Sequence, residues 1–255
     1  MSLQKAEAIV LKIQKLGETS KIVILFSKEF GLIKVVAKGA RGTKSKFLGS
    51  LDPINHVGIV FYHKEQRDLH LLSQADIIES FKSIKQDLNK LAYSMMAAEM
   101  VMRSQMERDP HANLFHLFVA FLRKLNESHN INENVFFWFQ IRFLKWLGFK
   151  PNLKMCQKCR KYIIDDERVR FSVEQGGWWC EHCSGVSGVT VVVSGKTINY
   201  LNQIEDSSLE AIDQISNGTE IYKESSLLLN KFMVYHIESL VHMKSVSFLE
   251  DVQRN

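Results

Sequence analysis

The stretch that decides the fold of the first third of the chain is residues 21–46, KIVILFSKEFGLIKVVAKGARGTKSK. Over residues 21–27, and again over residues 32–38, apolar residues alternate with other side chains, as they do in a half-buried β-strand. Residues 29–31, Glu-Phe-Gly, supply a turn between the two runs. A basic, glycine-containing stretch, residues 38–46, comes next. The segment therefore predicts two strands joined by a turn and followed by a cationic loop.

Similar runs lie on both sides of this segment, at residues 8–14, 54–63 and 68–74. In the first of them we expect Ile9, Leu11 and Ile13 to share one side of the strand. Five short strands separated by turn signals predict a small all-β barrel in residues 1–80. A basic connection between the third and fourth strands is typical of an OB-fold, which binds oligonucleotides on one face and with its loops.

Beyond residue 80 the apolar residues recur at steps of three and four, which indicates amphipathic helices. Helices are predicted at residues 88–102, 114–125 and 134–148, from about residue 196, and at about 219–244. The third is apolar on nearly every side and is expected in the core of a helical bundle, although a groove that receives a partner peptide is the alternative. The predicted fold class is therefore multi-domain α+β, with a barrel at 1–80 and a helical domain at 81–255.

The four cysteines of the chain form two Cys-x2-Cys pairs, Cys156 with Cys159 and Cys180 with Cys183. Two intervening residues let both thiolates of a pair reach one ion, and four thiolates complete the tetrahedral shell of Zn²⁺ with no position left for water. We expect one structural zinc ion per chain, held by a module at residues 152–188. Four unrelated buried thiols are the alternative, and His182, inside the second pair, is interpreted as a bystander.

Positive charge is concentrated near the start of the chain. Residues 1–50 hold ten Lys and Arg against three acidic residues, a net charge of +7, whereas the remainder holds 23 against 25, a net charge of −2. This asymmetry indicates a polyanionic partner, with nucleic acid the first choice and an acidic membrane surface the second. A solvated basic face is the alternative. The candidate DNA contacts are Lys34, Lys38, Arg41, Lys44 and Lys46. Phe30, Phe47 and Tyr62 are candidate platforms for stacked bases, although a place in the core is favoured for each of them taken singly.

Composition places the chain among soluble globular proteins, with 45% hydrophobic and 24% charged residues. Residues 1–5 do not open an apolar signal segment, and the most apolar run, residues 135–147, is too short to span a bilayer. Paired cysteines without a secretory signal indicate a reducing compartment. We therefore expect a cytoplasmic protein without a membrane partner.

Two motifs point weakly to enzymes. Ser194-Gly-Lys-Thr197 resembles the end of a P-loop, but Thr190 stands where that motif needs glycine, so a strand that ends in a helix capped by Ser194 is predicted instead. His63 with a later cysteine pair resembles a zinc deaminase signature, which has a proline where this chain has Met155. No catalytic residue is predicted, and a metalloenzyme acting on nucleic acid is the least favoured alternative.

The order of barrel, helical domain and four-cysteine module resembles the bacterial recombination mediator family RecO. Local matches occur at residues 16–18, 21–23, 30–31 and 36–41, at 148–153 ahead of the first cysteine pair, and at 171–172 and 176–177 ahead of the second. The resemblance covers essentially the whole chain. The family pattern often has a second arginine after Arg41, where this chain has Gly42.

The resemblance implies a non-catalytic DNA repair protein that is cytoplasmic and associated with the nucleoid. Such proteins bind single- and double-stranded DNA, anneal complementary strands coated by single-strand-binding protein and, with RecR, help to load the recombinase RecA. It also implies that the helical domain receives the acidic tail of single-strand-binding protein, for which the candidate contacts are Arg123, Lys124, Arg142 and Lys145. From the residues alone, an RNA-binding or ribosome-associated OB-fold protein stays open as an alternative.

Overall fold

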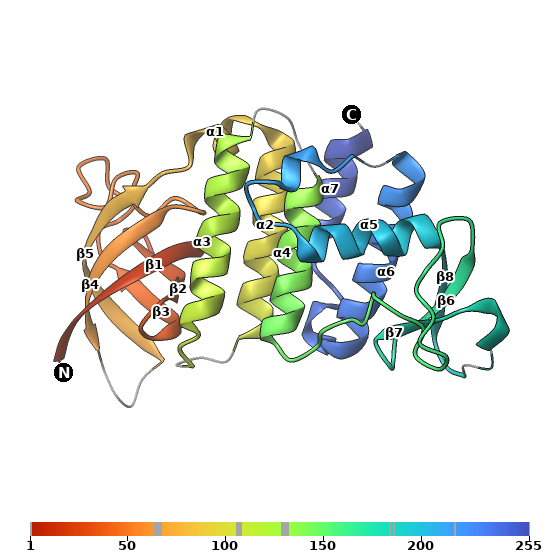
Figure 1. The fold of residues 1–255 in the computed structure, drawn as a ribbon. Helices are drawn as coiled ribbons and strands as arrows, with labels where there is room; N and C mark the ends of the chain where they lie inside the picture. The colour runs from red at the N-terminus through yellow and green to blue at the C-terminus, as the bar shows by residue number, and fades with distance from the viewer. Residues whose placement is uncertain are drawn as a thin grey trace. The chain divides into compact units, whose positions relative to one another are not determined.

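The structure is a computed structural model that describes residues 2–63, 68–105, 109–128, 133–183, 185, 187–216 and 218–254. It contains two compact units: Met1–Glu127 together with Met243–Asn255, and Ser128–His242. Figure 1 follows the chain through both. Among the described residues, no helix combines the length and the apolar character that crossing a membrane requires.

Five strands form a closed barrel in the first unit, as the sequence predicts. They are β1 (Ser2–Leu16), β2 (Ser20–Ser27), β3 (Gly31–Ala37), β4 (His56–His63) and β5 (Leu69–Glu79). Their order around the barrel is β1-β2-β3-β5-β4, and β3 and β5 are the parallel neighbours. This is an OB-type barrel.

A bulge in β1 lets one long strand close the barrel. Its first part pairs with β4 and its second part with β2, and the register shifts between Val10 and Lys12. Because of the bulge, Ile9 and Ile13 point to opposite faces of the strand. Ile13 packs against the interior cluster, whereas Ile9 and Leu11 do not belong to it. The expectation that these three residues share one side was therefore wrong, because simple alternation fails across a bulge.

Small and branched side chains fill the barrel interior. Val23, Leu25, Ile33 and Val35 face inward from β2 and β3. Phe47, in the loop after β3, joins the same cluster and is only 3% exposed. The core position that the sequence favoured for Phe47 is therefore confirmed, and the alternative of a stacking platform is not.

Four helices complete the first unit: α1 (Lys82–Gln86), α2 (Leu88–Ser104), α3 (Ala112–Glu127) and α7 (Lys244–Arg254). Asp87 caps α2, because its side chain accepts hydrogen bonds from the backbone N–H groups of Asn89 and Lys90. Phe115 of α3 meets Phe26 of β2 with ring centroids 5.8 Å apart. The barrel is thus packed on helices by aromatic side chains.

A charged network also ties the barrel to α3. The buried His56 ring places Nε2 2.7 Å from Oε1 of Glu7 and Nδ1 3.0 Å from Oε1 of Glu79. Arg123 donates hydrogen bonds from Nε to both carboxylate oxygens of Glu79, each at 3.0 Å. The hydrogen-bonded guanidinium of Arg123 lowers the pKa of Glu79 below its ordinary value of 4.5.

The second unit is built around α4 (Glu133–Trp146), with α5 (Gly195–Asp206) and α6 (Thr219–His236) beside it. Residues 134–141 of α4 are all buried, which confirms the expected core helix. The chain turns at Gly148, whose φ of 87° suits glycine, as the sequence predicts. Asn134 donates hydrogen bonds to the carbonyl oxygens of Ile212 and Ile215, so a buried polar residue is satisfied.

The last predicted helix, at about 219–244, ends earlier than expected, and a separate helix that the sequence did not predict begins where the prediction stopped. α6 ends at His236, a short 3₁₀ turn (Glu238–Leu240) follows, and α7 begins at Lys244. Ile237 has φ −128° and ψ 85°, outside the helical region, so the helix cannot continue through it. The chain returns to the first unit in α7. The change from strands to helices falls at the predicted boundary near residue 80, but α1, α2, α3 and α7 belong to the same compact unit as the barrel.

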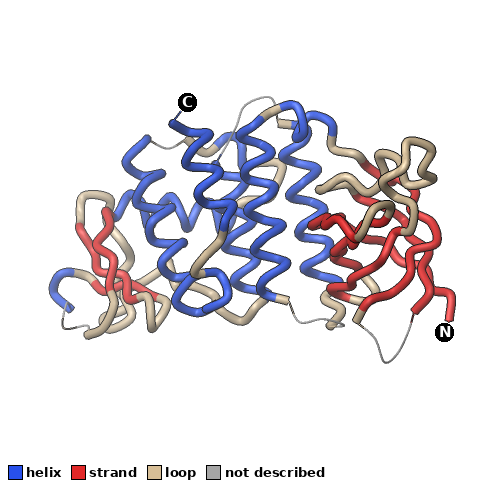
Figure 2. Tube along the Cα trace, turned by 180° about the vertical axis from the view of Figure 1, so that it is seen from behind, coloured by secondary structure: helices blue, strands red, loops and turns tan. Residues whose placement is uncertain are grey.

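The cysteine module carries a small sheet in the order β7-β6-β8, made of β6 (Arg168–Ser172), β7 (Gly177–Trp179) and β8 (Thr190–Ser194). Loops account for much of the chain around these strands (Figure 2). Trp178 is fully buried and donates a hydrogen bond from its indole N–H to the carbonyl oxygen of Leu153, 3.0 Å away. The module therefore has a small core of its own.

Candidate nucleic-acid surface and metal site

The predicted DNA-contacting cations lie on β3 and in the loop that follows it. Lys34 is half-buried on β3, and Lys38, Arg41, Lys44 and Lys46 are exposed in the following loop. Arg41 holds this loop against the β1–β2 turn, because its backbone N–H donates to the carbonyl oxygen of Thr19 and its guanidinium to that of Gly17. Among the described residues, no carboxylate forms an ion pair with any of the four exposed cations.

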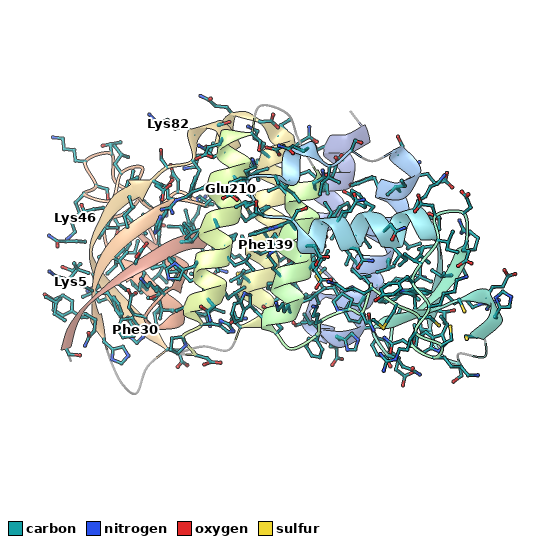
Figure 3. All side chains as sticks on the ribbon, in the orientation of Figure 1. Lys5, Phe30, Lys46, Lys82, Phe139 and Glu210 are labelled. Carbon is teal, nitrogen blue, oxygen red and sulfur yellow. The ribbon has the colours of Figure 1, made fainter. Side chains whose placement is uncertain are left out.

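A cation that the sequence analysis did not select extends this surface. Lys5 of β1 is exposed, and Figure 3 shows Lys5 and Lys46 projecting from the side of the barrel away from α2 and α3. The register of β1 against β4 places Lys5 opposite Val60, on the outer face of the barrel. Because phosphates bind wherever cations are accessible, Lys5 belongs to the candidate nucleic-acid surface.

The two remaining stacking candidates differ in accessibility. Phe30 packs against the barrel interior and meets Phe61 edge-on, with ring centroids 5.4 Å apart, and it is partly buried. Tyr62 points to the opposite side of β4 from Phe61 and is exposed. Tyr62 is therefore the better placed of the two to meet an unpaired base.

All four cysteines converge in the second unit. Their sulfur atoms lie within 4.8 Å of one another, and Sγ of Cys159 is 3.7 Å from Sγ of Cys180. Four Zn–S bonds of about 2.3 Å in a tetrahedron place sulfurs about 3.8 Å apart, so the arrangement fits a four-thiolate ion. His182, which is exposed, is not part of the cluster. The residues form a metal site with all four positions taken by sulfur.

Hairpin turns present these sulfurs. The backbone N–H of Cys156 donates to the carbonyl oxygen of Lys161, and Arg160, directly after the first pair, adopts a left-handed φ of 63° that closes this turn. The second pair spans the end of β7 and a 3₁₀ turn, in which the N–H of Cys183 donates to the carbonyl oxygen of Cys180.

The thiols ionise unequally. Burial opposes ionisation of Cys156, but N–H donors from the backbone of Cys180, Cys159 and Lys158 outweigh it and lower the pKa of Cys156 to about 6. Burial and the neighbouring sulfurs of Cys180 and Cys159 raise the pKa of Cys183 to about 12. Four thiolates repel one another at this distance, so a bound cation is needed to keep all of them ionised.

Structural contacts fill the position that resembles a P-loop. β8 ends at Ser194, whose hydroxyl accepts a hydrogen bond from the N–H of Thr197, as predicted for a helix cap. The carboxylate of Glu224 accepts hydrogen bonds from the N–H and hydroxyl of Ser194, each at 2.8 Å, and from the hydroxyl of Thr197 at 2.5 Å. An anionic side chain therefore lies where a phosphate would have to bind.

Three of the four cations predicted for a partner peptide have structural partners. Arg123 pairs with Glu79, and it belongs to the first unit, whereas Arg142 and Lys145 belong to the second. Arg142 donates hydrogen bonds to the carbonyl oxygens of Glu205 and Ser207 and lies 4.2 Å from the Trp138 ring centroid. Lys124 also has a partner within the chain. The peptide site stays a prediction at these residues, and the contacts of both arginines weigh against it.

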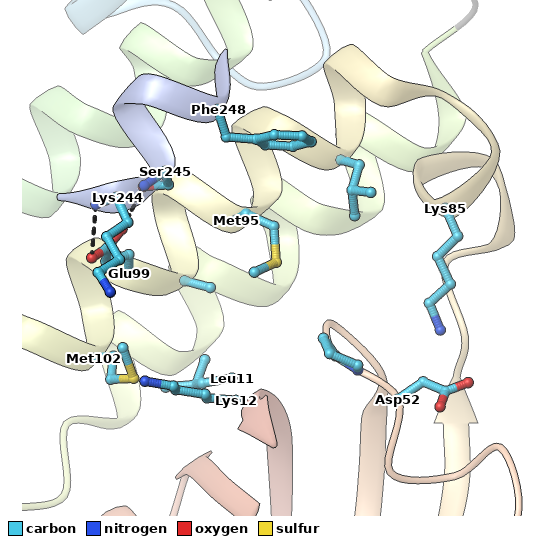
Figure 4. A pocket seen from close by; sticks show the side chains of 13 residues that line it. Leu11, Lys12, Asp52, Lys85, Met95, Glu99, Met102, Lys244, Ser245 and Phe248 are labelled. Carbon is cyan, nitrogen blue, oxygen red and sulfur yellow. Dashed lines mark hydrogen bonds between the residues drawn. The ribbon is translucent and has the colours of Figure 1, made fainter. Parts of the chain in front are cut away.

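The first unit has an apolar groove that the sequence did not reveal. It encloses about 670 Å³ between β1, α2 and α7, and Leu11, Met95, Met102 and Phe248 are among the residues that line it. Figure 4 shows Lys12, Lys85 and Lys244 around the same groove. Beside it, Glu99 accepts hydrogen bonds from the backbone N–H groups of Lys244 and Ser245, which start α7.

These features define a class: an OB-type barrel protein with a cationic surface and a four-cysteine metal site. Comparison with known proteins agrees with this class and identifies a family within it. The family model for the N terminus of recombination protein O matches residues 1–81, and the model for its C terminus matches residues 85–245.

Curated relatives match over almost the full length. A DNA repair protein RecO of Alkaliphilus metalliredigens is 26% identical over 92% of this chain and 94% of its own length. Those of Pelotomaculum thermopropionicum and Bacillus subtilis are each 29% identical over 98% of this chain, and over 94% and 95% of their own lengths. The chain belongs to the RecO family of DNA repair proteins.

Proposed function

We propose that this protein binds single- and double-stranded DNA through the barrel and anneals complementary strands. The observation that carries the proposal is the group of exposed cations at Lys38, Arg41, Lys44 and Lys46, which have no ion-pair partner among the described residues. A cation without a carboxylate partner is available to a phosphate, and each phosphate bound releases counterions.

Annealing follows from the same electrostatics. Two complementary strands repel each other through their phosphates, and a cationic surface that binds both lowers that repulsion. The protein then supplies proximity and charge neutralisation, and no covalent step is required. Membership in the RecO family supports a role with RecR and single-strand-binding protein in loading RecA, in the cytoplasm at the nucleoid.

The ion in the cysteine site is proposed to be zinc. A set of four thiolates in a tetrahedron is typical of structural zinc sites and leaves no ligand position for water or substrate. The residues that would hold it are Cys156, Cys159, Cys180 and Cys183. The ion would keep two hairpins together in a module with a small core, and catalysis is not assigned to it.

The acidic tail of single-strand-binding protein is proposed to bind the groove of the first unit. A peptide with acidic residues and an apolar side chain needs an apolar floor with cations near it. The groove supplies Met95, Met102 and Phe248 for the first requirement and Lys12 and Lys244 for the second. Lys12→Gln with Lys244→Gln should weaken the binding of a labelled tail peptide in fluorescence anisotropy, and Arg123→Gln with Arg142→Gln tests the alternative position.

A strand-annealing assay tests the main proposal. The variant with Lys38→Gln, Arg41→Gln, Lys44→Gln and Lys46→Gln should anneal complementary oligonucleotides much more slowly than the wild type. The matched control removes one arginine and three lysines that are exposed in the second unit, Lys158, Arg170, Lys223 and Lys231, and should anneal normally. The control variant should melt near the wild-type temperature, and the barrel variant, which loses the hydrogen bond from the Arg41 guanidinium to Gly17, should stay folded at the temperature of the assay.

Equal annealing by the two variants would refute a barrel-based mechanism. Competition between DNA and RNA of the same sequence belongs in the same experiment, because an RNA-binding protein would favour the RNA. Intact oligonucleotides at the end of the reaction are expected, and cleaved products would show an enzyme.

A further inference from the structure

The outer surface of the barrel has an aromatic and apolar row whose function the charge pattern does not explain. The strand registers place Leu3 of β1 opposite Tyr62 of β4, Tyr62 opposite Leu71 of β5, and Leu71 opposite Val36 of β3. We call Leu3, Tyr62, Leu71 and Val36 the outer row. They are consecutive neighbours across four strands that are about 4.8 Å apart.

The row faces solvent. Tyr62 is 38% exposed and Leu3 is 56% exposed, and Leu71 and Val36 are half-buried. On β4 the neighbouring side chains Ile59 and Phe61 point into the barrel, so Tyr62 must point out. Apolar side chains that adjoin one another at the surface form a candidate binding site, in contrast to single exposed apolar residues.

A cation lies near each end of the row, both on the same side of it, because β1 and β3 run in the same direction. Lys5 follows Leu3 by two residues on β1, and Lys38 follows Val36 by two residues at the end of β3; both are exposed. Two residues along a strand span about 7 Å, within reach of a lysine side chain. A ligand on the row therefore meets apolar surface and one aromatic ring, with positive charge near each end of the row.

We propose that unpaired bases stack on Tyr62, with Leu3 and Leu71 beside the ring, and that this contact makes the barrel prefer single strands to duplex. The proposal rests on the proposed function, because the same lysines hold the phosphates. A base in a duplex is covered on both faces by its neighbours, whereas an unpaired base can place one face on an aromatic ring. The outer row thus distinguishes single strands from duplex by their exposed base faces, whereas the cations bind the phosphates of both.

Substitution of the ring tests this directly. Tyr62→Leu keeps an apolar side chain on the row but removes the ring, and Tyr62→Phe keeps the ring. In fluorescence anisotropy with labelled oligothymidine, Tyr62→Leu should bind at least fivefold more weakly than the wild type, whereas Tyr62→Phe should bind nearly as well. A mixed-sequence duplex should bind all three proteins alike, and the salt dependence should not change. Tyr235→Leu is the control, since Tyr235 is an exposed tyrosine of α6.

The outcomes separate this proposal from the one on which it rests. If the barrel variant neutralised at Lys38, Arg41, Lys44 and Lys46 loses affinity for both forms but Tyr62→Leu binds oligothymidine normally, the stacking proposal is wrong and the DNA surface stands. If Tyr62→Leu weakens duplex and single strand equally, the side chain supports the fold and not a base, and the proposal is again overturned. If the barrel variant binds both single strand and duplex normally, the DNA-binding surface of the proposed function has been assigned wrongly.

Discussion

At the scale of single residues, burial separates structural side chains from those available to a ligand. Phe47 and Tyr62 had equal standing as stacking candidates in the sequence. Phe47 lies in the loop after β3 but joins the barrel core, whereas Tyr62 lies inside a strand but faces out. Alternation along β4 was enough to indicate the direction of Tyr62. Nothing in the loop sequence fixes the direction of Phe47, because a loop has no regular period.

Removal of the Phe47 ring should destabilise the protein without affecting a DNA contact. Phe47→Ala should lower the free energy of unfolding by about 3–5 kcal/mol, as is usual for a buried phenylalanine. Chemical denaturation measures this loss, and DNA affinity measured well below the melting temperature should match the wild type. A variant of normal stability that has lost affinity for single strands would show that Phe47 stacks on bases after all.

The Glu79 carboxylate should contribute stability that disappears in acid. Its pKa is lowered in the folded protein, chiefly by Arg123, so its contribution is complete above the ordinary value of 4.5 and is lost as the pH falls through the lower, folded-state pKa. Glu79→Gln removes this contribution at every pH. The difference in melting temperature between the wild type and Glu79→Gln should therefore shrink as the pH is lowered from about 7 to about 3.5. A difference that stays constant over this range would contradict the assignment.

At the scale of secondary structure elements, periodic patterns predicted where elements lie, and local geometry decided where they end. β2 was expected at residues 21–27 and is found at Ser20–Ser27. The bulge at Val10 and the break at Ile237 were missed, because neither is accompanied by proline or glycine. The helix α7 was not predicted from the sequence, since hydrogen bonds at its start are made with α2, more than a hundred residues earlier.

The start of α7 should depend on one distant carboxylate. Glu99 accepts hydrogen bonds from the N–H of Ser245 at 2.8 Å and from its hydroxyl at 2.7 Å, and it also pairs with Arg103. Glu99→Ala leaves these donors unsatisfied and should cost about 1–3 kcal/mol. Hydrogen exchange should accelerate at the amides of residues 244–254. Glu18→Ala, at an exposed position of the β1–β2 turn, should change neither measurement, and an equal effect of both substitutions would remove the anchoring role of Glu99.

At the scale of the whole molecule, the sequence predicted both the barrel and the cysteine cluster, because their patterns are local. It did not predict that three helices and the C-terminal helix belong to the same compact unit as the barrel, nor did it reveal the groove among them. These features depend on contacts between segments far apart in the chain. Of the basic residues in the first 50, Lys38, Arg41, Lys44 and Lys46 are exposed in one loop, whereas Lys12 lines the groove, so a count of charges could not indicate which surface each one joins.

Metal removal should destabilise the cysteine module. The wild type should contain about one zinc ion per chain by elemental analysis, and Cys156→Ser should lose the metal and lower the melting temperature, since binding of a structural ion contributes directly to folding. His182→Ala should keep the metal content and the melting temperature of the wild type, because His182 lies outside the cluster. Loss of metal in His182→Ala, or full metal content in Cys156→Ser, would contradict the four-thiolate site.

The central claim is that the barrel cations bind the phosphates of DNA, and the salt dependence of binding tests it most directly. The logarithm of the association constant for oligothymidine should be measured against the logarithm of the salt concentration for the wild type, for the variant neutralised at Lys38, Arg41, Lys44 and Lys46, and for the matched variant of the second unit. If the four cations each bind one phosphate of a single strand, their loss should reduce the slope by up to about 3. The matched variant should keep the wild-type slope and affinity. An unchanged slope in the barrel variant, with a reduced slope in the matched variant, would place the DNA surface in the second unit and contradict this account.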